Sequence, residues 1–243
     1  MGKKRKNINL NNNLWVISLG GSRIAPKEEE IDWRFIQRFK KLIDKNSEKR
    51  FVVVTGGGAT ARKYIQALKK LGKNMKKQSS AGIAITRFHA SVLARIFGKK
   101  ANPPSYDELP RNMTKVKNLL RKNKIVFCGA LRFHPKQTSD GTAADLAAYL
   151  KCGFINLTNV SGLYTSNPKK NKNARLIKNI SWSRFYNIAN KIRFKAGQHF
   201  VLDKDAAETI MNEKIPTYIT GSLKEMNNII SGNKNFKGTL IYG

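Results

Sequence analysis

The sequence predicts an α/β fold in which helices cover both faces of a mainly parallel sheet. Short apolar runs of strand length alternate along the chain with longer stretches whose apolar residues recur at helical spacing. Two of these runs end in glycine clusters, which is typical of a buried strand that turns tightly into a helix. Since 40% of the 243 residues are apolar, the chain can bury one sizeable core, and one compact domain is expected.

The first half of the chain opens with residues 1–13, which are basic and then rich in Asn and therefore predict a disordered arm. The domain is expected to span residues 14–243. Asn102-Pro103-Pro104 ends the last helix of this half, because proline cannot continue a helix. Expected strands cover 14–19 and 51–54, and expected helices cover 31–43, 60–71 and 84–97.

The second half continues the alternation of strands and helices. Thr138, Ser139 and Asp140 form a good N-cap cluster for an Ala-rich helix that runs to Leu150. Expected strands cover 125–128, 154–157, 217–219 and 240–242, and further expected helices cover 181–189 and 204–212. This order of elements favours a parallel sheet, and no internal repeat is visible in the chain.

The net charge is the most unusual property of the sequence. The chain carries 47 Lys and Arg against 15 Asp and Glu, or +32 at pH 7, which is more than solubility requires. No carboxylate occurs from Leu146 to Leu202, and residues 61–77 include Lys and Arg but no acid. Such a field attracts polyanions, so RNA or the ribosome is a possible partner. A genome-wide bias toward Lys, Asn and Ile would give the same composition.

Two further features bear on location and redox state. No apolar run reaches the roughly 18 residues of a membrane span, and the N-terminus lacks the apolar core of a secretory signal. We therefore expect a cytoplasmic protein with no membrane partner. Cys128 and Cys152 each lie at the edge of an apolar segment outside any spacing motif, which predicts two reduced core residues.

Glycine clusters stand at two expected strand-to-helix junctions, Gly20-Gly21-Ser22 and Gly56-Gly57-Gly58. Glycine lets backbone N–H groups approach an anion, and the N-terminus of the next helix adds its dipole. Because ligands of open α/β sheets bind at the carboxyl ends of the strands, the two loops together could hold two phosphate groups. Each cluster alone also suits an ordinary tight turn, and neither matches the P-loop or dinucleotide pattern.

Six segments in a fixed order carry a resemblance to a known family. They are SLGGS (18–22), VVTGGGATARKYI (53–65), GIAITRFHA (82–90), HPKQTSDGTAADLAA (134–148), TNVSGLYTSNPKK (158–170) and AGQHFVLDKDAA (196–207). Over nearly the whole chain after the arm, this set resembles the amino-acid-kinase superfamily and within it archaeal-type uridylate kinase. The resemblance implies a three-layer α/β/α domain, usually assembled as a homo-hexamer, that transfers the γ-phosphoryl group of ATP to UMP with Mg²⁺.

The resemblance also implies a set of site residues. Residues expected at ATP are Ser18, Leu19, Gly20, Gly21, Ser22, Gly58, Arg62, Thr158, Tyr164 and Asn167. Residues expected at the acceptor are Gly57, Ser79, His134, Pro135, Lys136, Gln137, Thr138, Ser139 and Asp140. No residue is assigned as a metal ligand.

Arg62 and Asp140 are the candidate catalytic residues. The phosphate of UMP is already ionised, so transfer depends on alignment and charge neutralisation rather than on covalent help. Arg62 follows Gly58 closely enough to reach back toward phosphates, although it also suits an exposed cation of a basic helix. Asp140 is the only carboxylate of its loop and could organise a cation. The hydroxyls of Thr138 and Ser139 could donate to phosphate or simply cap the helix.

Four polar positions depart from the pattern of this family. Relatives commonly carry Lys or another charged residue at the position of Ser18, and an Asp that holds the ribose of UMP at the position of Ser79. The family's VDG and DP are here Val160-Ser161-Gly162 and Asn167-Pro168. Asn keeps the shape of Asp and one acceptor but loses its charge, so ATP affinity should be reduced.

Two other functions remain open at this level. A degenerate, strongly basic kinase fold could bind RNA or the ribosome. A related kinase could phosphorylate another small phosphate or a carboxylate, since Ser79 and an acceptor loop two residues longer than usual both alter the acceptor side.

Overall fold

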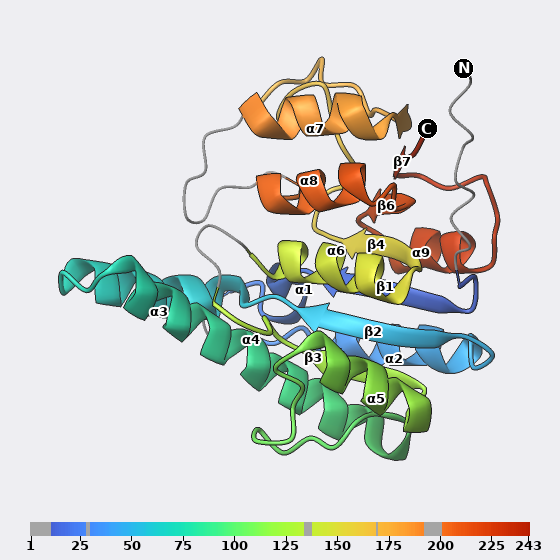
Figure 1. Cartoon of the computed structure of the whole chain (residues 1–243). Helices are drawn as coiled ribbons and strands as arrows, with labels where there is room; N and C mark the ends of the chain where they lie inside the picture. Colours follow the sequence, from blue (N-terminus) through green and yellow to red (C-terminus); the bar gives the residue numbers. More distant parts are fainter. Residues whose placement is uncertain (1–10, 28–29, 134–137, 169, 192–200) are drawn as a thin grey trace, which may run out of the picture.

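The computed structural model describes residues 11–27, 30–133, 138–168, 170–191 and 201–243, which form one seven-stranded sheet between helices (Figure 1). The strands are β1 (Leu14–Leu19), β2 (Arg50–Thr55), β3 (Ile125–Cys128), β4 (Gly153–Leu157), β5 (Asn179–Ile180), β6 (Thr217–Thr220) and β7 (Thr239–Ile241). Their order is β3-β2-β1-β4-β6-β7-β5. Neighbours from β3 to β6 are parallel, whereas β7 is antiparallel to β6 and parallel to β5. The predicted mainly parallel sheet is confirmed.

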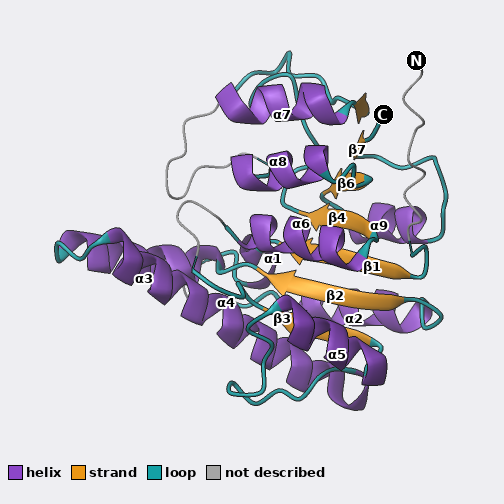
Figure 2. Cartoon of the chain, viewed as in Figure 1, coloured by secondary structure: helices purple, strands orange, loops and turns teal. Residues whose placement is uncertain are grey.

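Helices cover both faces of the sheet (Figure 2). They are α1 (Gly21–Ile24), α2 (Trp33–Lys45), α3 (Gly58–Lys70), α4 (Met75–Phe97), α5 (Met113–Lys122), α6 (Ser139–Leu150), α7 (Trp182–Lys191), α8 (Lys204–Asn212) and α9 (Leu223–Ile230). Helices α5 to α8 pack on one face, and α2, α4 and α9 pack on the other. Helix α3 and the start of α4 project beyond the sheet (Figure 1). None of the helices so described is long and apolar enough to cross a membrane.

The core lies on both sides of the sheet because successive strand residues face opposite ways. On β2, Val52 and Val54 belong to the cluster under α5 and α6, while Phe51 and Val53 belong to the cluster under α2 and α4. Burial on both faces explains why the strands are continuous apolar runs in the sequence. Cys128 and Cys152 are buried and free, as predicted, and burial raises the pKa of each thiol to about 12.

The bounds of β3 and α8 agree with the sequence predictions, and α4 differs most. This helix begins at Met75 rather than at residue 84. The Asn74 side chain caps this start by accepting from the Lys77 nitrogen at 3.0 Å. Its first two turns are largely polar and therefore show no apolar periodicity. The sequence analysis also missed β5, which has two residues, and α5 and α9, whose buried faces do recur at helical spacing.

The strand order reverses between β1 and β4, which is the point where open α/β sheets bind ligands. The Gly20 nitrogen donates to the Leu157 carbonyl across this point at 3.1 Å. At the amino ends of the same two strands, the Asn11 nitrogen donates to the Lys151 carbonyl at 2.8 Å. Residues 1–10 lie outside the described residues, so the predicted division into an arm and one domain stays a prediction.

Candidate active site

The two glycine loops touch each other through their backbones at the carboxyl ends of β1 and β2. A Cβ atom added to Gly21 would lie 2.0 Å from the Gly58 nitrogen, and one added to Gly56 would lie 2.4 Å from the Gly21 nitrogen. Gly58 also has a φ of 62°, in the region that side chains rarely adopt. Contact between the loops therefore requires glycine at these three positions, whether or not a ligand is bound.

The contact also places the N-terminus of α3 at the carboxyl ends of β1 and β2. Gly57 is the N-cap of this helix, and no side chain caps it. Because the first N–H groups of a helix have no partner within the helix, they can donate to an anion. The geometry is therefore compatible with the phosphate-binding role that the sequence suggests for Gly57 and Gly58.

Asp140, on the first turn of α6, lies against the end of β1. The hydroxyl of Ser18, which is fully buried, donates to Oδ1 of Asp140 at 2.5 Å. Burial raises the pKa of Asp140 to about 7, the bond from Ser18 opposes this shift, and the nearby Asp203 adds to it. Near neutral pH the carboxyl is therefore poised between its neutral and ionised forms. No described residue donates to its second oxygen.

Asp203 joins the N-termini of α6 and α8. Its Oδ2 accepts from the nitrogen and the hydroxyl of Thr138 at 3.0 and 2.5 Å, and its Oδ1 accepts from the Ala206 nitrogen at 2.7 Å. The Thr138 hydroxyl in turn accepts from the Asp140 nitrogen at 3.1 Å, so Thr138 caps α6. The sequence analysis missed Asp203, although an Asp just before a helix is a common N-cap pattern.

Helix α4 holds the start of the expected acceptor loop. The Ala130 nitrogen donates to the Thr86 hydroxyl at 3.0 Å, and the Arg87 guanidinium donates to the carbonyls of Ala130 and Leu131 at 3.1 and 2.7 Å. Neither Thr86 nor Arg87 was singled out from the sequence. The next residues expected at the acceptor lie outside the described residues; they are His134, Pro135, Lys136 and Gln137.

The loop that follows β4 is fixed at its far end by β7. The Leu163 nitrogen donates to the Thr239 hydroxyl at 2.8 Å, and Tyr164 pairs with Leu176 in an antiparallel bridge. A Cβ atom on Gly162 would lie only 2.6 Å from the Thr239 hydroxyl. The Asn167 carbonyl accepts from two nitrogens later in the loop, at 3.1 and 2.9 Å. Backbone contacts and Thr239 therefore set the course of this loop.

Arg23, one residue beyond the first glycine loop, ties that loop to the end of β4. Its Nε donates to the Thr158 carbonyl at 2.8 Å, and a second nitrogen donates to the Gly221 carbonyl. Burial lowers the pKa of Arg23, and the neighbouring Asp32 opposes this shift. Arg23 is not among the residues expected from the sequence, where its only indication is a cation directly after a glycine loop.

The remaining expected residues are less connected. Arg62 is half-buried on the first turn of α3 and has no hydrogen-bond or ion-pair partner among the described residues, and Ser79 is half-buried on α4. No hydrogen bond between described residues joins either of them to Asp140. His89 supports the second glycine loop, because its Nδ1 lies 2.8 Å from the Gly56 carbonyl and its side chain is 4% exposed.

The carboxylates of this site fit a Mg²⁺ ion that arrives with phosphates. Mg²⁺ usually keeps several waters and takes one or two carboxylates in addition to substrate phosphates. Among the described residues, none donates to the second oxygen of Asp140, whereas both oxygens of Asp203 accept from helix termini. In the described part of the chain, no three His, Cys, Asp or Glu side chains gather in a way that could hold a metal. A metal cage made by the protein alone is therefore not indicated there.

Known proteins resemble this chain over most of its length. Residues 13–221 match the model of the amino acid kinase family. A uridylate kinase from Thermococcus kodakarensis is 39% identical over 208 residues, which cover 85% of this chain and 89% of that protein. A uridylate kinase from Archaeoglobus fulgidus is 34% identical over 206 residues, which cover 84% and 89% of the two chains.

Solved structures show the same arrangement of elements. The crystal structure of the uridylate kinase from Archaeoglobus fulgidus matches with a TM-score of 0.78 and 31% identity, over 93% of this chain and 99% of that one. A UMP kinase from Bacillus anthracis matches with a TM-score of 0.76 and 17% identity, over 95% and 96% of the two chains. The second likeness is one of fold alone.

Proposed function

The chain belongs to the amino acid kinase family, and we propose that it is a uridylate kinase, which transfers the γ-phosphoryl group of ATP to UMP. The contact between Ser18 and Asp140 carries this proposal, because it places a carboxylate beside the first glycine loop at the carboxyl end of β1. A carboxylate among phosphate-binding groups makes chemical sense as the organiser of a cation. Relatives that carry the name uridylate kinase support the choice of acceptor.

The chain's own groups would bind and align the phosphates of ATP and UMP and neutralise the charge that develops during transfer. An oxygen of the UMP phosphate forms a bond to the γ-phosphorus of ATP while the bond from that phosphorus to the β-phosphate oxygen breaks and ADP leaves. Because the attacking oxygen is already ionised, no general base is required. Backbone N–H groups of the glycine loops would hold the phosphates of ATP and UMP, and Arg62 would neutralise the charge that develops between them.

The other assignments follow the order of the loops. We place the phosphates of ATP at residues 18–22 and at Gly58, and the adenosine at Thr158, Tyr164 and Asn167. Gly57, Ser79 and residues 134–140 would hold UMP. ATP is the co-substrate in this proposal. Asp140 would hold Mg²⁺, which neutralises phosphate charge when it is bound.

A coupled assay of ADP formation tests this function directly. UMP, CMP and AMP are each offered with ATP over a range of Mg²⁺ concentrations, and UMP should be preferred. Asp140→Asn should lower kcat by about 100-fold or more, as loss of a group that organises transition-state charge does. The matched control is Asp145→Asn on the same helix, where the carboxylate accepts from Thr209 rather than from Ser18. Absence of UMP-dependent ADP formation at every Mg²⁺ concentration would refute the proposal.

A homo-oligomer, a hexamer in the resembled family, is the second part of the proposal. Large apolar side chains are exposed on the projecting helices α3 and α4, among them Tyr64 at 54%, Met75 at 59% and Phe88 at 55%. Such exposed apolar groups commonly mark a contact with another chain. Light scattering should give a mass several times 27.4 kDa, and Phe88→Glu should reduce it.

The alternative of a degenerate kinase that only binds RNA is not favoured, because relatives named as enzymes match along most of the chain. RNA binding in addition to kinase activity stays a prediction. Its support is the exposure of Lys69 and Lys70 on α3, of Lys73 in the turn that follows, and of Lys76 and Lys77 on α4. Another small phosphate acceptor stays open until the acceptors are compared.

A further inference from the structure

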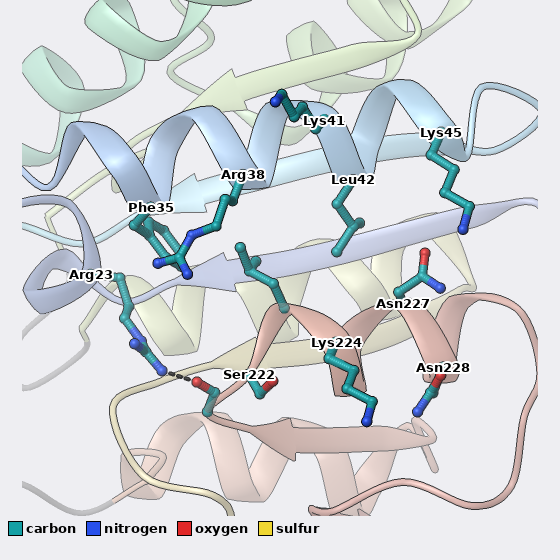
Figure 3. A pocket seen from close by; sticks show the side chains of 12 residues that line it. Arg23, Phe35, Arg38, Lys41, Leu42, Lys45, Ser222, Lys224, Asn227 and Asn228 are labelled. Carbon is teal, nitrogen blue, oxygen red and sulfur yellow. Dashed lines mark hydrogen bonds between the residues drawn. The ribbon is translucent and has the colours of Figure 1, made fainter.

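A basic cleft lies between α2 and α9, on the face of the sheet opposite to α6 and α8 (Figure 3). Its volume is about 640 Å³, within the range of roughly 300–1,000 Å³ that is typical of small-molecule sites. Arg23 stands at one end, where it donates to the Gly221 carbonyl. The lining residues are Arg23, Phe35, Arg38, Lys41, Leu42, Lys45, Gly221, Ser222, Leu223, Lys224, Asn227 and Asn228.

Helix α2 contributes a row of cations to this cleft. Arg38, Lys41 and Lys45 are spaced by three and four residues and therefore lie along one side of the helix over about 10 Å. Lys224 lines the cleft from α9, with its side chain directed away from α2 (Figure 3). Lys41, Lys45 and Lys224 have no hydrogen-bond or ion-pair partner in the described part of the chain. Arg38 acts on Arg23 as a like charge and thereby helps to lower the pKa of Arg23, and a bound polyanion would offset this repulsion.

Acids near the cleft are engaged elsewhere, and none of the described lining residues is an acid. Asp32 caps α2 by accepting from the Phe35 nitrogen at 2.8 Å and acts electrostatically on Arg23. Asp44 pairs with Lys40 and Lys100 at 2.6 and 2.8 Å. Glu225 accepts from the Asn228 amide and the Lys237 nitrogen at 3.2 and 3.0 Å. Among the described residues, none of these three acids forms an ion pair with Arg38, Lys41 or Lys45.

Several donors of the cleft are already held in place. Arg23 is fixed by the carbonyls of Thr158 and Gly221 and lies 5.6 Å from the ring centre of Phe35, so it needs no ordering before it meets an anion. The side-chain oxygen Oδ1 of Asn227 accepts from Nδ2 of Asn46 at 3.0 Å, which leaves the side-chain amide hydrogens of Asn227 to donate. The Ser222 hydroxyl, at the start of α9, has no partner among the described residues.

We propose that this cleft binds a chain of linked phosphates, either bare or as the phosphate chain of a free nucleotide. A row of cations along one helix suits several phosphates in succession, whereas a single phosphate would engage only part of it. The apolar floor formed by Phe35 and Leu42 and a volume of small-molecule size favour a small molecule over the extended backbone of RNA. The cleft adjoins the proposed ATP site through Arg23, which follows Ser22 and donates to the Thr158 carbonyl, but its lining includes neither the glycine loops nor Asp140.

The test is calorimetric titration of inorganic tripolyphosphate into the full chain and two double variants. Lys41→Gln with Lys45→Gln removes two cleft charges, and Lys69→Gln with Lys70→Gln removes two exposed charges from α3. Any binding to the ATP site is common to both variants, so their difference isolates the cleft. We expect the cleft variant to lose at least 10-fold in affinity and the α3 variant less than 2-fold, with UDP formation unchanged in both.

Three results would overturn the proposal. The first is an equal loss of tripolyphosphate affinity in both double variants, which would indicate attraction by the total charge alone. The second is unchanged affinity in the cleft variant. The third is binding of a short oligouridylate, but not of tripolyphosphate, that depends on Lys41 and Lys45, because the occupant would then be RNA. A parallel titration with UTP separates the two sources: tighter binding than tripolyphosphate identifies a nucleotide, and equal binding identifies the bare chain.

Discussion

The phosphate side and the adenosine side of the proposed ATP site are built in different ways. On the phosphate side, Gly21, Gly56 and Gly58 lie in backbone contact with one another, and no added side chain fits. On the adenosine side, the backbone is set by Thr239 and by turns within the loop. Ser161 and Asn167 stand there at positions where the sequence resemblance leads us to expect acids.

The difference shows which positions a diverging site can change. Replacement of a glycine on the phosphate side would separate two loops and disturb the fold itself. Replacement of an acid on the adenosine side alters a contact to the ligand while Gly162 and Thr239 still hold the loop. If the resemblance holds at these positions, the chain has kept the glycines and lost the acids, which agrees with this difference in structural cost.

Substitution of Gly21 should have the largest effect. In Gly21→Ala the new Cβ would lie 2.0 Å from a backbone nitrogen, so no side-chain rotation can relieve the clash. We expect a loss of about 3 kcal/mol or more in the free energy of unfolding, at the upper end of overpacking effects. In the matched control Gly20→Ala, the Cβ meets the Leu157 oxygen at 3.2 Å and should cost about 1 kcal/mol or less. Equal losses in urea denaturation would contradict the proposed backbone contact.

The pH dependence of stability should separate Asp140→Asn from the unsubstituted chain. The folded-state pKa of Asp140 is about 7, above the ordinary value of 3.8, so the folded chain retains a proton that the unfolded chain releases between these pH values. The free energy of unfolding that this group contributes is therefore lost as the pH rises from about 4 to 7. Asp140→Asn does not show this loss, because Asn cannot titrate.

The stability of Asp140→Asn relative to the unsubstituted chain should accordingly rise by roughly 1–4 kcal/mol over this interval and stay constant above about pH 8. Urea denaturation at pH 5, 6, 7 and 8 measures it. Parallel curves for the two chains would mean that the carboxyl is not perturbed by burial.

Asp203→Asn should have a smaller effect on stability and a specific effect on its neighbour. It weakens two helix caps, at a cost of about 1–2 kcal/mol, and it removes a negative charge that raises the pKa of Asp140. The pKa of Asp140 should therefore fall, as followed by the carboxyl carbon chemical shift. Glu208→Gln, on the exposed side of α8, is the control and should leave that pKa unchanged.

Asn167→Asp should have the smallest effect, because the adenosine loop keeps its course without the acid. Restoring a charged acceptor should raise ATP affinity by several-fold and by no more than about 10-fold. Asn171→Asp adds the same charge to an exposed position of that loop and should change the affinity less than 2-fold. Similar gains in both variants would show a general effect of charge in a basic chain.

The sequence was informative where local pattern determines structure. The glycine loops, the N-cap cluster before Asp140 and most strands follow from short stretches with strong propensities. Arg23, Thr86 and Arg87 could not be assigned in this way, because each acts on a segment far away in the chain. Asp203 has a local N-cap pattern, but its bonds to Thr138 could not be predicted from it. The helical spacing of α5 and α9 was present in the sequence and was missed.

Separate titration of Mg²⁺-ATP and UMP into the unsubstituted chain tests the central claim most directly, namely that the glycine framework and Asp140 suffice to bind nucleotide without the acids of the adenosine loop. Calorimetry should show one UMP for each chain and, when the cleft between α2 and α9 is disabled by Lys41→Gln and Lys45→Gln, one ATP. That ATP should be lost when Gly21→Ala is added, if the variant folds. No ATP binding by the unsubstituted chain, together with its appearance in Asn167→Asp, would contradict the account.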